Sequence, residues 1–256
     1  MKAMILAAGT GSRLKPLTDT MPKALIPVRG VPMLERAIIK IKAAGFTHLV
    51  INIHHKGEQI IDFLASKDNF GMDISISDER NYLLETGGAI KQAKKMLDGG
   101  EPFLVHNVDI FSDVDLAAMY RLHAGSKSLA TLLVSRRQTS RQLLFNKEDR
   151  LCGWRNRETG EVKSFFPTFD PSLYFEYAFG GVHVLSPAIF DRMEDWTGRF
   201  SIIDFYLSVC HRESIRFYTE NNLQLIDAGK PEGLEDAEKS MPRKDNAYLL
   251  HKPNFI

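Results

Sequence analysis

The sequence predicts an α/β protein in which helices cover both faces of a mixed, mostly parallel sheet, giving a three-layer α/β/α sandwich. The chain opens with a short apolar run at residues 2–8 that ends in a glycine, as expected of a buried parallel strand. Strand and helix patterns then alternate as far as residue 135. Such alternation indicates parallel strands, because each crossover between them needs a helix-length connection.

The elements of the first half follow from their hydrophobic spacing. From Pro32 onward, apolar residues recur every three or four positions, which predicts an amphipathic helix that ends at Gly45. The same reasoning predicts further helices at residues 57–65, 87–97 and 115–124 and further strands at 48–53, 72–77, 102–109 and 128–135. The strands are short and largely apolar, as expected of strands buried on both faces.

The second half has a different pattern. Residues 141–166 contain short strands separated by Asn-Lys-Glu-Asp and Arg-Glu-Thr-Gly, which predict hairpin turns. A strand at 176–185 leads into a helix with Ser186 as its predicted N-cap and Pro187 in its first turn. We therefore predict one domain over residues 1–240, with halves at 1–135 and 136–240, followed by a polar tail at 241–256.

Composition excludes several classes of protein. Apolar residues make up 44% and charged residues 25% of the 256 residues, as in ordinary globular proteins, and the net charge is only +1. There is no global attraction to nucleic acid or to an anionic membrane, so we expect neither as a partner. Cys152 and Cys210 lie far apart, with no Cys or His at metal-ligand spacing around them, and no apolar run could span a bilayer. We expect a cytoplasmic protein with reduced cysteines.

The segment after the first strand, Gly9-Thr10-Gly11, raises three alternatives. A dinucleotide-binding loop requires a third glycine where this chain has Leu14, and a helix directly behind the loop. Pro16 and Pro22 exclude that helix. The remaining alternatives are a loop that holds phosphate through backbone N–H groups and basic side chains, and an ordinary turn with solvated basic residues.

Other polar residues are ambiguous on their own. Asp109 and Asp227 each end a predicted strand, where an aspartate more often forms a turn or a helix cap than a ligand site. Asp113 or Asp115 fits a cap for the helix that begins at Leu116. His54 and His55 follow a strand, and because adjacent strand residues face opposite sides, joint metal binding is disfavoured.

One pattern is more specific than any of these residues alone. The run L-A-A-G-x-G-x-R-L-x-P-L-T-x-x-x-P-K at residues 6–23 resembles the signature of the sugar-1-phosphate nucleotidylyltransferases. Further similar stretches follow in the same order at residues 85–90, 107–113, 179–187 and 227–238. The resemblance covers roughly residues 1–240 and implies a Rossmann-like fold of the nucleotide-diphospho-sugar transferase type, with residues 1–135 binding the nucleotide and 136–240 binding the sugar and completing the metal site.

The resemblance also implies roles for individual residues. Asp109 and Asp227 would bind one Mg²⁺, Arg13 would hold the outer phosphates, and Lys23 would neutralise charge on the departing pyrophosphate. Gly180 and Gly181 would lie against the sugar. The residues implied to line the nucleotide are Ala8, Gly9, Gly11, Glu85, Thr86, Gly87, Gly88 and Asn107.

The implied substrates are a nucleoside triphosphate, UTP or GTP, and a sugar-1-phosphate. The chain is most similar to the short N-acetylmuramate-1-phosphate uridylyltransferases of bacterial cell-wall recycling, followed by mannose- and heptose-1-phosphate guanylyltransferases. Val108 departs from the family pattern, in which glycine usually precedes the metal-binding aspartate. This departure leaves open a regulatory paralogue that binds sugar nucleotides without turnover, and the sequence leaves open whether the protein is a monomer or a homodimer.

Overall fold

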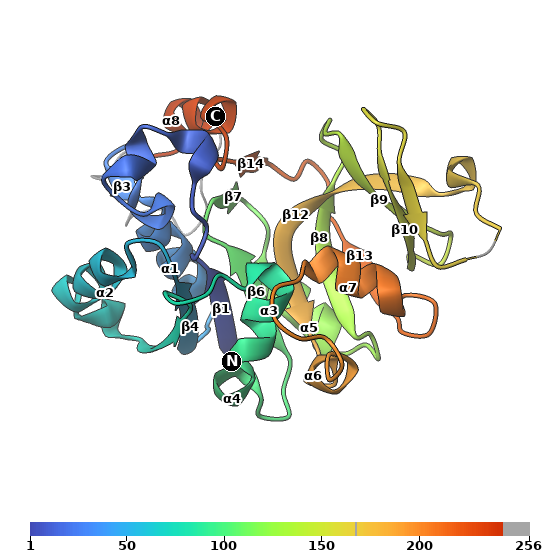
Figure 1. Cartoon of the computed structure of the whole chain (residues 1–256), viewed down its shortest axis with the longest axis horizontal. Helices are drawn as coiled ribbons and strands as arrows, with labels where there is room; N and C mark the ends of the chain where they lie inside the picture. Colours follow the sequence, from blue (N-terminus) through green and yellow to red (C-terminus); the bar gives the residue numbers. More distant parts are fainter. Residues whose placement is uncertain (167, 243–256) are drawn as a thin grey trace. The chain divides into compact units, whose positions relative to one another are not determined.

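The computed structural model describes residues 1–166 and 168–242, so the predicted tail at 241–256 lies almost entirely outside the described residues. The chain divides into two compact units (Figure 1). Unit 1 comprises residues 1–83, 105–117 and 222–256, and unit 2 comprises residues 84–104 and 118–221. Each unit is therefore assembled from separate stretches of sequence.

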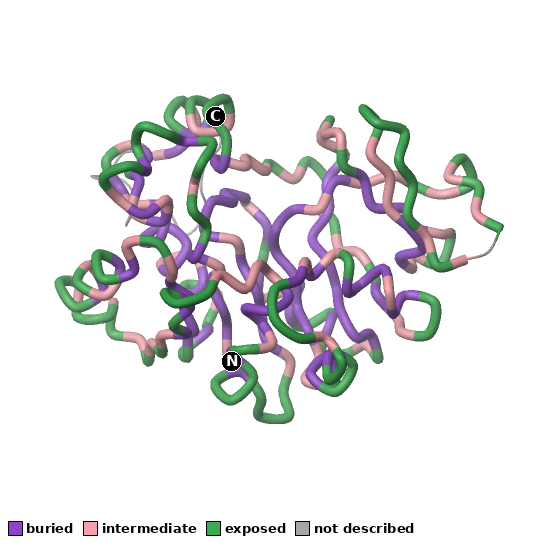
Figure 2. Tube along the Cα trace, viewed as in Figure 1, coloured by how far each residue is buried: buried purple, intermediate pink, exposed green. Residues whose placement is uncertain are grey.

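Unit 1 is built on the parallel sheet that the sequence predicts. Its strands follow the order β6-β1-β4-β5, and β4 pairs in parallel with both of its neighbours. The central strands are buried on both faces, and Figure 2 shows them as a buried layer. The sheet strands and main helices are β1 (Lys2–Leu6), β4 (His48–Ile53), β5 (Asp73–Asp78), β6 (Phe103–Asn107), α1 (Met33–Ala43), α2 (Gly57–Ser66) and α8 (Pro231–Ser240).

Helix α1 shows why the hydrophobic spacing was informative. Leu34, Ile38 and Ile41 recur on one face, and each is fully buried. The helix ends where Gly45 adopts a φ of 88°, and Phe46 N–H donates to Ile41 O in the manner of a Schellman cap. A glycine is required there because other residues rarely adopt this conformation.

Unit 1 also contains short elements that hydrophobic spacing does not predict. The loop after β1 has no α-helix, as expected, but it coils through three 3₁₀ turns, η1 (Ser12–Leu14), η2 (Leu17–Asp19) and η3 (Lys23–Leu25). Strand β7 (Ile110–Ser112) pairs antiparallel with β14 (Leu225–Asp227). The remaining short elements are the pair β2 (Pro27–Val28) and β3 (Val31–Pro32), and η4 (Asp68–Gly71).

The C-terminal part of the described chain is fastened to the N-terminal part of unit 1. Arg36 is buried in α1 and donates to Val28 O and to Pro242 O, both at 2.8 Å. Glu238 of α8 accepts the backbone N–H of Arg29 at 2.9 Å. These contacts hold α8 and β14 in unit 1 although they come late in the sequence.

Unit 2 carries the mixed part of the sheet. Its strands follow the order β11-β10-β9-β12, and β8 pairs with β12 antiparallel and with β13 in parallel. The predicted hairpins are confirmed, because β9, β10 and β11 are antiparallel neighbours. The strands are β8 (Ala130–Ser135), β9 (Arg141–Phe145), β10 (Leu151–Asn156), β11 (Val162–Ser164), β12 (Phe175–Leu185) and β13 (Ile215–Tyr218), and the 3₁₀ turn is η5 (Pro171–Leu173).

Two of the helices predicted in unit 2 differ from the structure. The helix predicted at 87–97 is two helices, α3 (Glu85–Gln92) and α4 (Lys94–Leu97), which meet at Ala93. Helix α6 (Ile189–Arg192) begins later than predicted, and Ser186 is not its N-cap. The Ser186 hydroxyl instead donates to Ser128 O at 2.8 Å. The other helices are α5 (Leu116–Ala124), which begins in unit 1, and α7 (Ile202–Val209).

A buried histidine in unit 2 makes stability depend on pH. His123 lies within hydrogen-bond distance of Thr131 Oγ1 and Ser186 Oγ, and burial lowers its pKa from 6.5 to about 4. Between pH 6.5 and 4, His123 is therefore protonated in the unfolded chain but neutral in the folded chain. The free energy of unfolding consequently falls as the pH decreases. We expect a loss of up to about 3 kcal/mol between pH 6.5 and 4 from this residue.

Urea unfolding at several pH values tests this expectation. The His123→Gln variant removes the titrating ring, so its unfolding free energy should fall less steeply over that interval than that of the wild type. Because the carboxylates titrate alike in both proteins, their contribution cancels in the comparison. Equal slopes in the two proteins would contradict the assignment.

The structure also bears on the membrane and cysteine expectations. Within residues 1–166 and 168–242, no helix is long and apolar enough to cross a bilayer. Cys152 and Cys210 are both buried free thiols, as expected. Burial raises the pKa of the Cys210 thiol to about 12, so this thiol stays protonated at neutral pH.

Candidate active site

The glycine loop of unit 1, residues 7–25, is held in one shape by close packing. Gly11 has a φ of 64°, and a Cβ there would lie 2.5 Å from Thr18 Cγ2 and 3.1 Å from Lys23 Cβ. Only glycine fits both the backbone conformation and the space. Thr18 Oγ1 also donates to Gly11 O at 3.0 Å, and Leu14 and Thr18 are buried.

This packing leaves the two basic side chains of the predicted site in different settings. Arg13 is exposed, and within the described part of the chain no hydrogen bond or ion pair holds its guanidinium. Lys23, whose side chain is only 12% exposed, points its Nζ onto Asp109 Oδ2. The exposed guanidinium of Arg13 is therefore available to bind an anion from solution, whereas the ammonium of Lys23 is already paired with Asp109.

Asp109 and Asp227 are brought together by the β7–β14 pair. In its register Asp227 stands opposite Ile110, the residue after Asp109, and Ala228 N–H donates to Asp109 O at 2.9 Å. The pairing thus joins residues from distant parts of the sequence at the carboxyl end of β6. This is the edge at which α/β sheets bind ligands.

Gly229 defines the centre of this cluster. A Cβ at Gly229 would touch Asp109 Oδ2 and would lie 3.0 Å from Asp227 Oδ1 and 3.1 Å from Lys23 Nζ. Its backbone N–H donates to Asp227 Oδ1 at 3.1 Å. We call Lys23, Asp109, Asp227 and Gly229 the carboxylate cradle. Sequence analysis did not single out Gly229, although it follows the second aspartate by only two positions.

The charge of the cradle suits a divalent cation. Two carboxylates and one ammonium give a net charge of −1, and Mg²⁺ is usually bound through one or two carboxylates, with phosphates and water as the other ligands. Within residues 1–166 and 168–242, no cluster of three or more His, Cys, Asp or Glu side chains could hold a metal ion. The two carboxylates therefore fit a cation whose other ligands are phosphate oxygens and water.

Residues beside the cradle are placed as follows. Asn107 is the last residue of β6, and its carbonyl lies 2.8 Å from Nδ1 of the buried His106. Val108 is 3% exposed, and its N–H donates to Leu6 O at 3.2 Å. The valine side chain is thus packed inside unit 1. Ala8 is buried. A Cβ added at Gly9 would make only an ordinary contact, with Lys23 Cδ 3.9 Å away.

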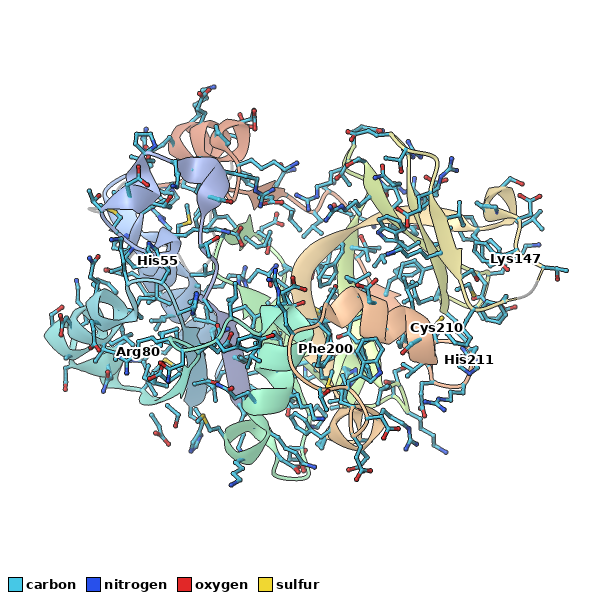
Figure 3. All side chains as sticks on the ribbon, viewed as in Figure 1. His55, Arg80, Lys147, Phe200, Cys210 and His211 are labelled. Atoms are coloured by element: carbon cyan, nitrogen blue, oxygen red, sulfur yellow. The ribbon has the colours of Figure 1, made fainter. Side chains whose placement is uncertain are left out.

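The predicted nucleotide segment at residues 85–88 lies in unit 2, at the start of α3. The N–H groups of Gly87 and Gly88 donate to Phe200 O at 2.9 and 3.4 Å, and a Cβ on Gly87 would overlap the ring of Phe200, which is labelled in Figure 3. Thr86 Oγ1 accepts the Ile202 N–H at 2.9 Å. The two glycines therefore pack the helix against the segment that precedes α7.

The other residues predicted for this unit have distinct surroundings. Glu85 has a φ of 59° and is paired with Arg199, with Nη2 2.6 Å from Oε1. Gly180 and Gly181 lie buried in β12, where the pairing with β8 shifts register. Gly181 has a φ of 68°, which the bulge requires and which other residues rarely adopt.

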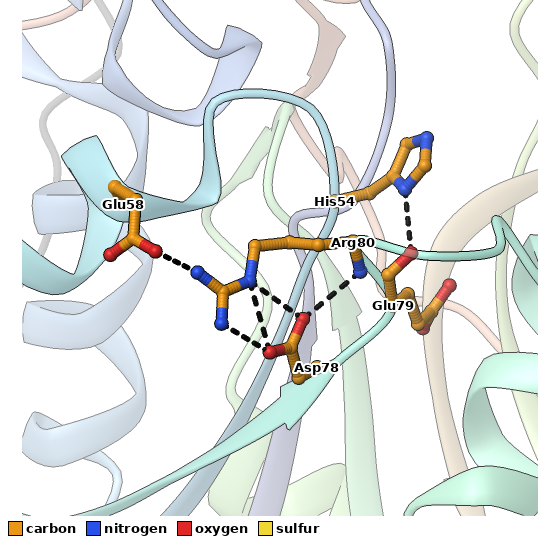
Figure 4. A network of polar contacts seen from close by, with 5 residues as sticks. All are labelled: His54, Glu58, Asp78, Glu79 and Arg80. Carbon is orange, nitrogen blue, oxygen red and sulfur yellow. Dashed lines mark hydrogen bonds and ion pairs between the residues drawn. The ribbon is translucent and has the colours of Figure 1, made fainter.

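Unit 1 contains a polar network that sequence analysis missed. Asn52 in β4 and Glu79 after β5 are each 2% exposed and are joined by a hydrogen bond of 2.7 Å. His54 Nδ1 lies 2.6 Å from Glu79 O, whereas the neighbouring His55 is exposed (Figures 3 and 4). Both histidines follow Ile53, the last residue of β4, so their different surroundings do not depend on the alternation of strand residues. The only sequence signal for Asn52 is its place inside an apolar run.

Comparison with known proteins identifies the family of this chain. The chain matches the family model described as nucleotidyl transferase over residues 2–243. It is 48% identical to N-acetylmuramate alpha-1-phosphate uridylyltransferase of Neisseria meningitidis serogroup B over 121 residues, which are 47% of this chain and 52% of that protein. It is 31% identical to mannose-1-phosphate guanylyltransferase 1 of Arabidopsis thaliana over 198 residues, 76% of this chain and 52% of that protein. The chain spans about half the length of these curated relatives.

Solved structures share the fold. UDP-glucose pyrophosphorylase, in complex with UDP-glucose, superposes with a TM-score of 0.75 at 19% identity, covering 93% of this chain and 97% of that one. HddC from Yersinia pseudotuberculosis, in complex with GMP-PN, superposes with a TM-score of 0.71 at 22% identity, covering 93% and 98%. At these identities the similarity confirms the α/β fold alone.

Proposed function

Because this chain belongs to the nucleotidyl transferase family, we propose that it transfers a nucleotidyl group from a nucleoside triphosphate to a sugar-1-phosphate. The observation that carries this proposal is the carboxylate cradle, in which Lys23, Asp109 and Asp227 surround Gly229. A phosphate-transfer enzyme has to gather several negative charges, and this cluster combines cation ligands with a positive side chain.

In the proposed reaction, an oxygen of the sugar phosphate attacks the α-phosphorus of the triphosphate. A new P–O bond forms there, and the bond to the β-phosphate breaks to release pyrophosphate. The second pKa of a phosphate monoester is near ~6, so the nucleophile is already ionised at neutral pH and needs no general base. The work left to the protein is to orient the substrates and to stabilise the charge on the leaving group.

The residues of unit 1 divide this work. Asp109 and Asp227 would hold Mg²⁺, which supplies positive charge to the phosphate oxygens when bound. The exposed Arg13 guanidinium would bind the outer phosphates with a forked pair of donors. Lys23 would stabilise the pyrophosphate as charge develops on it, and Ala8, Gly9, Gly11 and Asn107 would line the nucleotide. In unit 2, we assign Glu85–Gly88 to the nucleotide and Gly180 and Gly181 to the sugar.

The proposed substrates are UTP and N-acetylmuramate-1-phosphate, in a cytoplasmic pathway that supplies cell-wall nucleotide sugars. The relative named for this activity is the more similar of the two, at 48% identity, but over 47% of the chain. GTP with mannose- or heptose-1-phosphate is the alternative, supported by a longer match at 31% identity.

Pyrophosphate release provides the direct test. UTP, GTP, CTP, dTTP and ATP are each combined with N-acetylmuramate-, mannose-, heptose- and glucose-1-phosphate, with Mg²⁺ or with EDTA. We expect release with one preferred pair and none in EDTA. Nucleotide binding without release across the whole panel would favour the regulatory paralogue and overturn the enzymatic proposal.

The position of Lys23 predicts two separable effects of Lys23→Met. The value of kcat should fall about 10²-fold, the usual cost of removing one group that stabilises transition-state charge. The Mg²⁺ concentration for half-maximal rate should also fall, because the cradle loses the ammonium that competes for Asp109. Steady-state kinetics with a Mg²⁺ titration measure both effects.

Lys42→Ala provides the control for Lys23→Met, because Lys42 also lies in unit 1 but its Nζ donates to Phe70 O on the surface. This control should match the wild type in both measurements. A rise in the Mg²⁺ requirement of the Lys23 variant would show that the lysine assists cation binding instead of opposing it.

A further inference from the structure

Asn52 occupies a special position in the sheet of unit 1. It lies near the carboxyl end of β4, in register with Leu6 of β1 on one side and with Ser77 of β5 on the other. From the middle strand, one side chain can therefore reach the ends of both neighbouring strands. Asn52 is 2% exposed, so it can act on a ligand only through other residues.

Both the oxygen and the nitrogen of the Asn52 side-chain amide form hydrogen bonds. Its Oδ1 accepts the N–H of Ala7 at 2.7 Å, and its Nδ2 donates to Glu79 Oε1 at 2.7 Å. Ala7 is the first residue of the glycine loop, and Glu79 is the first residue after β5. One buried amide thus links the starting points of two segments that leave the same edge of the sheet.

Glu79 is itself fixed by its backbone. Its N–H donates to Ile53 O at 2.8 Å, and its carbonyl accepts the Tyr82 N–H at 3.0 Å. The same carbonyl lies 2.6 Å from His54 Nδ1, as Figure 4 shows. The start of residues 79–83 is therefore held rigidly to β4, and the Asn52 amide extends this hold to the glycine loop.

We propose that Asn52 is a positioning residue that couples the glycine loop to the rigidly held start of residues 79–83, so that the glycine loop takes up the nucleoside triphosphate in one geometry. This inference rests on the proposed function, in which Ala8, Gly9 and Gly11 line the nucleotide. An apolar side chain at this position would leave Ala7 and Glu79 unlinked. A buried polar network that is fully paired specifies one arrangement of its members.

The hydrogen bond between residues 52 and 79 can be broken by one substitution and restored by a second, with donor and acceptor exchanged. Asn52→Asp sets a carboxylate against that of Glu79, so both cannot be ionised in contact. Combining Asn52→Asp with Glu79→Gln restores a donor opposite an acceptor, while the new carboxylate can still accept the Ala7 N–H. The single and double variants differ from one another by only one amide-for-carboxylate exchange.

We expect Asn52→Asp to weaken binding of UTP or GTP, measured by calorimetry with Mg²⁺, by about tenfold, equivalent to ~1.4 kcal/mol. Binding should recover as the pH is lowered and the carboxylate pair takes up a proton. The double variant should return to within about threefold of the wild type, or ~0.7 kcal/mol. The KM for the sugar phosphate should be the same in all three proteins.

Glu58→Gln is the matched control. It removes one carboxylate from the neighbouring surface ion pair with Arg80, and it should leave nucleotide binding unchanged. A purely structural role for Asn52 would instead lower thermal stability and weaken both substrates alike. That result, or a double variant no better than the single one, would overturn the coupling.

Failure of the coupling and failure of the proposed function give different results. Calorimetry requires no turnover, so a wild type that binds nucleotide without releasing pyrophosphate would overturn the function while the coupling is still tested. An active wild type whose Asn52→Asp variant binds nucleotide normally would overturn the coupling alone. A wild type that binds neither UTP nor GTP would overturn both.

Discussion

Asp109→Asn and Asp227→Asn should each lower kcat by at least about 10²–10³-fold, the cost found for removing one charge-stabilising group from a phosphate- or acyl-transfer site. Each change removes one negative charge from the carboxylate cradle and keeps the shape of the side chain. The cradle then has too little negative charge to hold a divalent cation beside Lys23. Thermal unfolding should stay close to that of the wild type, because the backbone bond from Ala228 to Asp109 is unaffected.

The measurement is pyrophosphate release across a range of Mg²⁺ concentrations. Asp113→Asn is the matched control, since Asp113 directly follows β7 and its Oδ1 accepts the Gln224 N–H at 2.9 Å, which an amide oxygen can also do. Its rate should equal that of the wild type. A near-normal rate in either cradle variant would show that the cation is held elsewhere.

Gly229→Ala should have an effect of comparable size without any change in charge. The added Cβ would touch Asp109 Oδ2 and lie within 3.0 Å of Asp227 Oδ1, so the carboxylates must move apart. Overpacking of this kind costs about 1–3 kcal/mol of stability. Activity should also fall, by about 10²-fold, because a displaced cation ligand misplaces the reacting groups.

Calorimetry measures the loss of stability, and steady-state kinetics with a Mg²⁺ titration measure the loss of activity. Gly125→Ala is the control, because its Cβ would make only ordinary contacts, the nearest being 3.5 Å from Arg121 O. This control should keep both the rate and the Mg²⁺ requirement of the wild type. A Gly229→Ala variant with unchanged Mg²⁺ dependence would mean that the cradle does not bind the cation.

The sequence predicted the sheet better than it predicted the loops. The strand and helix patterns of unit 1 matched closely, because their apolar residues repeat over many positions, as in α1. The break between α3 and α4 was missed because apolar spacing continues across Ala93. Strand β7 has only three residues, which is too short for an alternating pattern to be recognised.

The sequence singled out those members of the candidate site that lie in recognisable motifs. Lys23 and Asp109 were both assigned from motif resemblance, and the structure brings them into contact. The role of Gly229 could not be foreseen, since it depends on the space between three side chains from different elements. Asn52 was missed for a related reason, because its two partners follow different strands and no spacing in the sequence connects them.

The β7–β14 pairing also sets the order in which the site can be completed during synthesis. Asp109 is synthesised with the first half of the chain, whereas Asp227 and Gly229 are added only after all of unit 2 has been made. A nascent or truncated chain that ends before residue 225 therefore has one carboxylate, neutralised by Lys23, and lacks the cradle. The carboxylate cradle is complete only once β14 has returned to pair with β7 in unit 1.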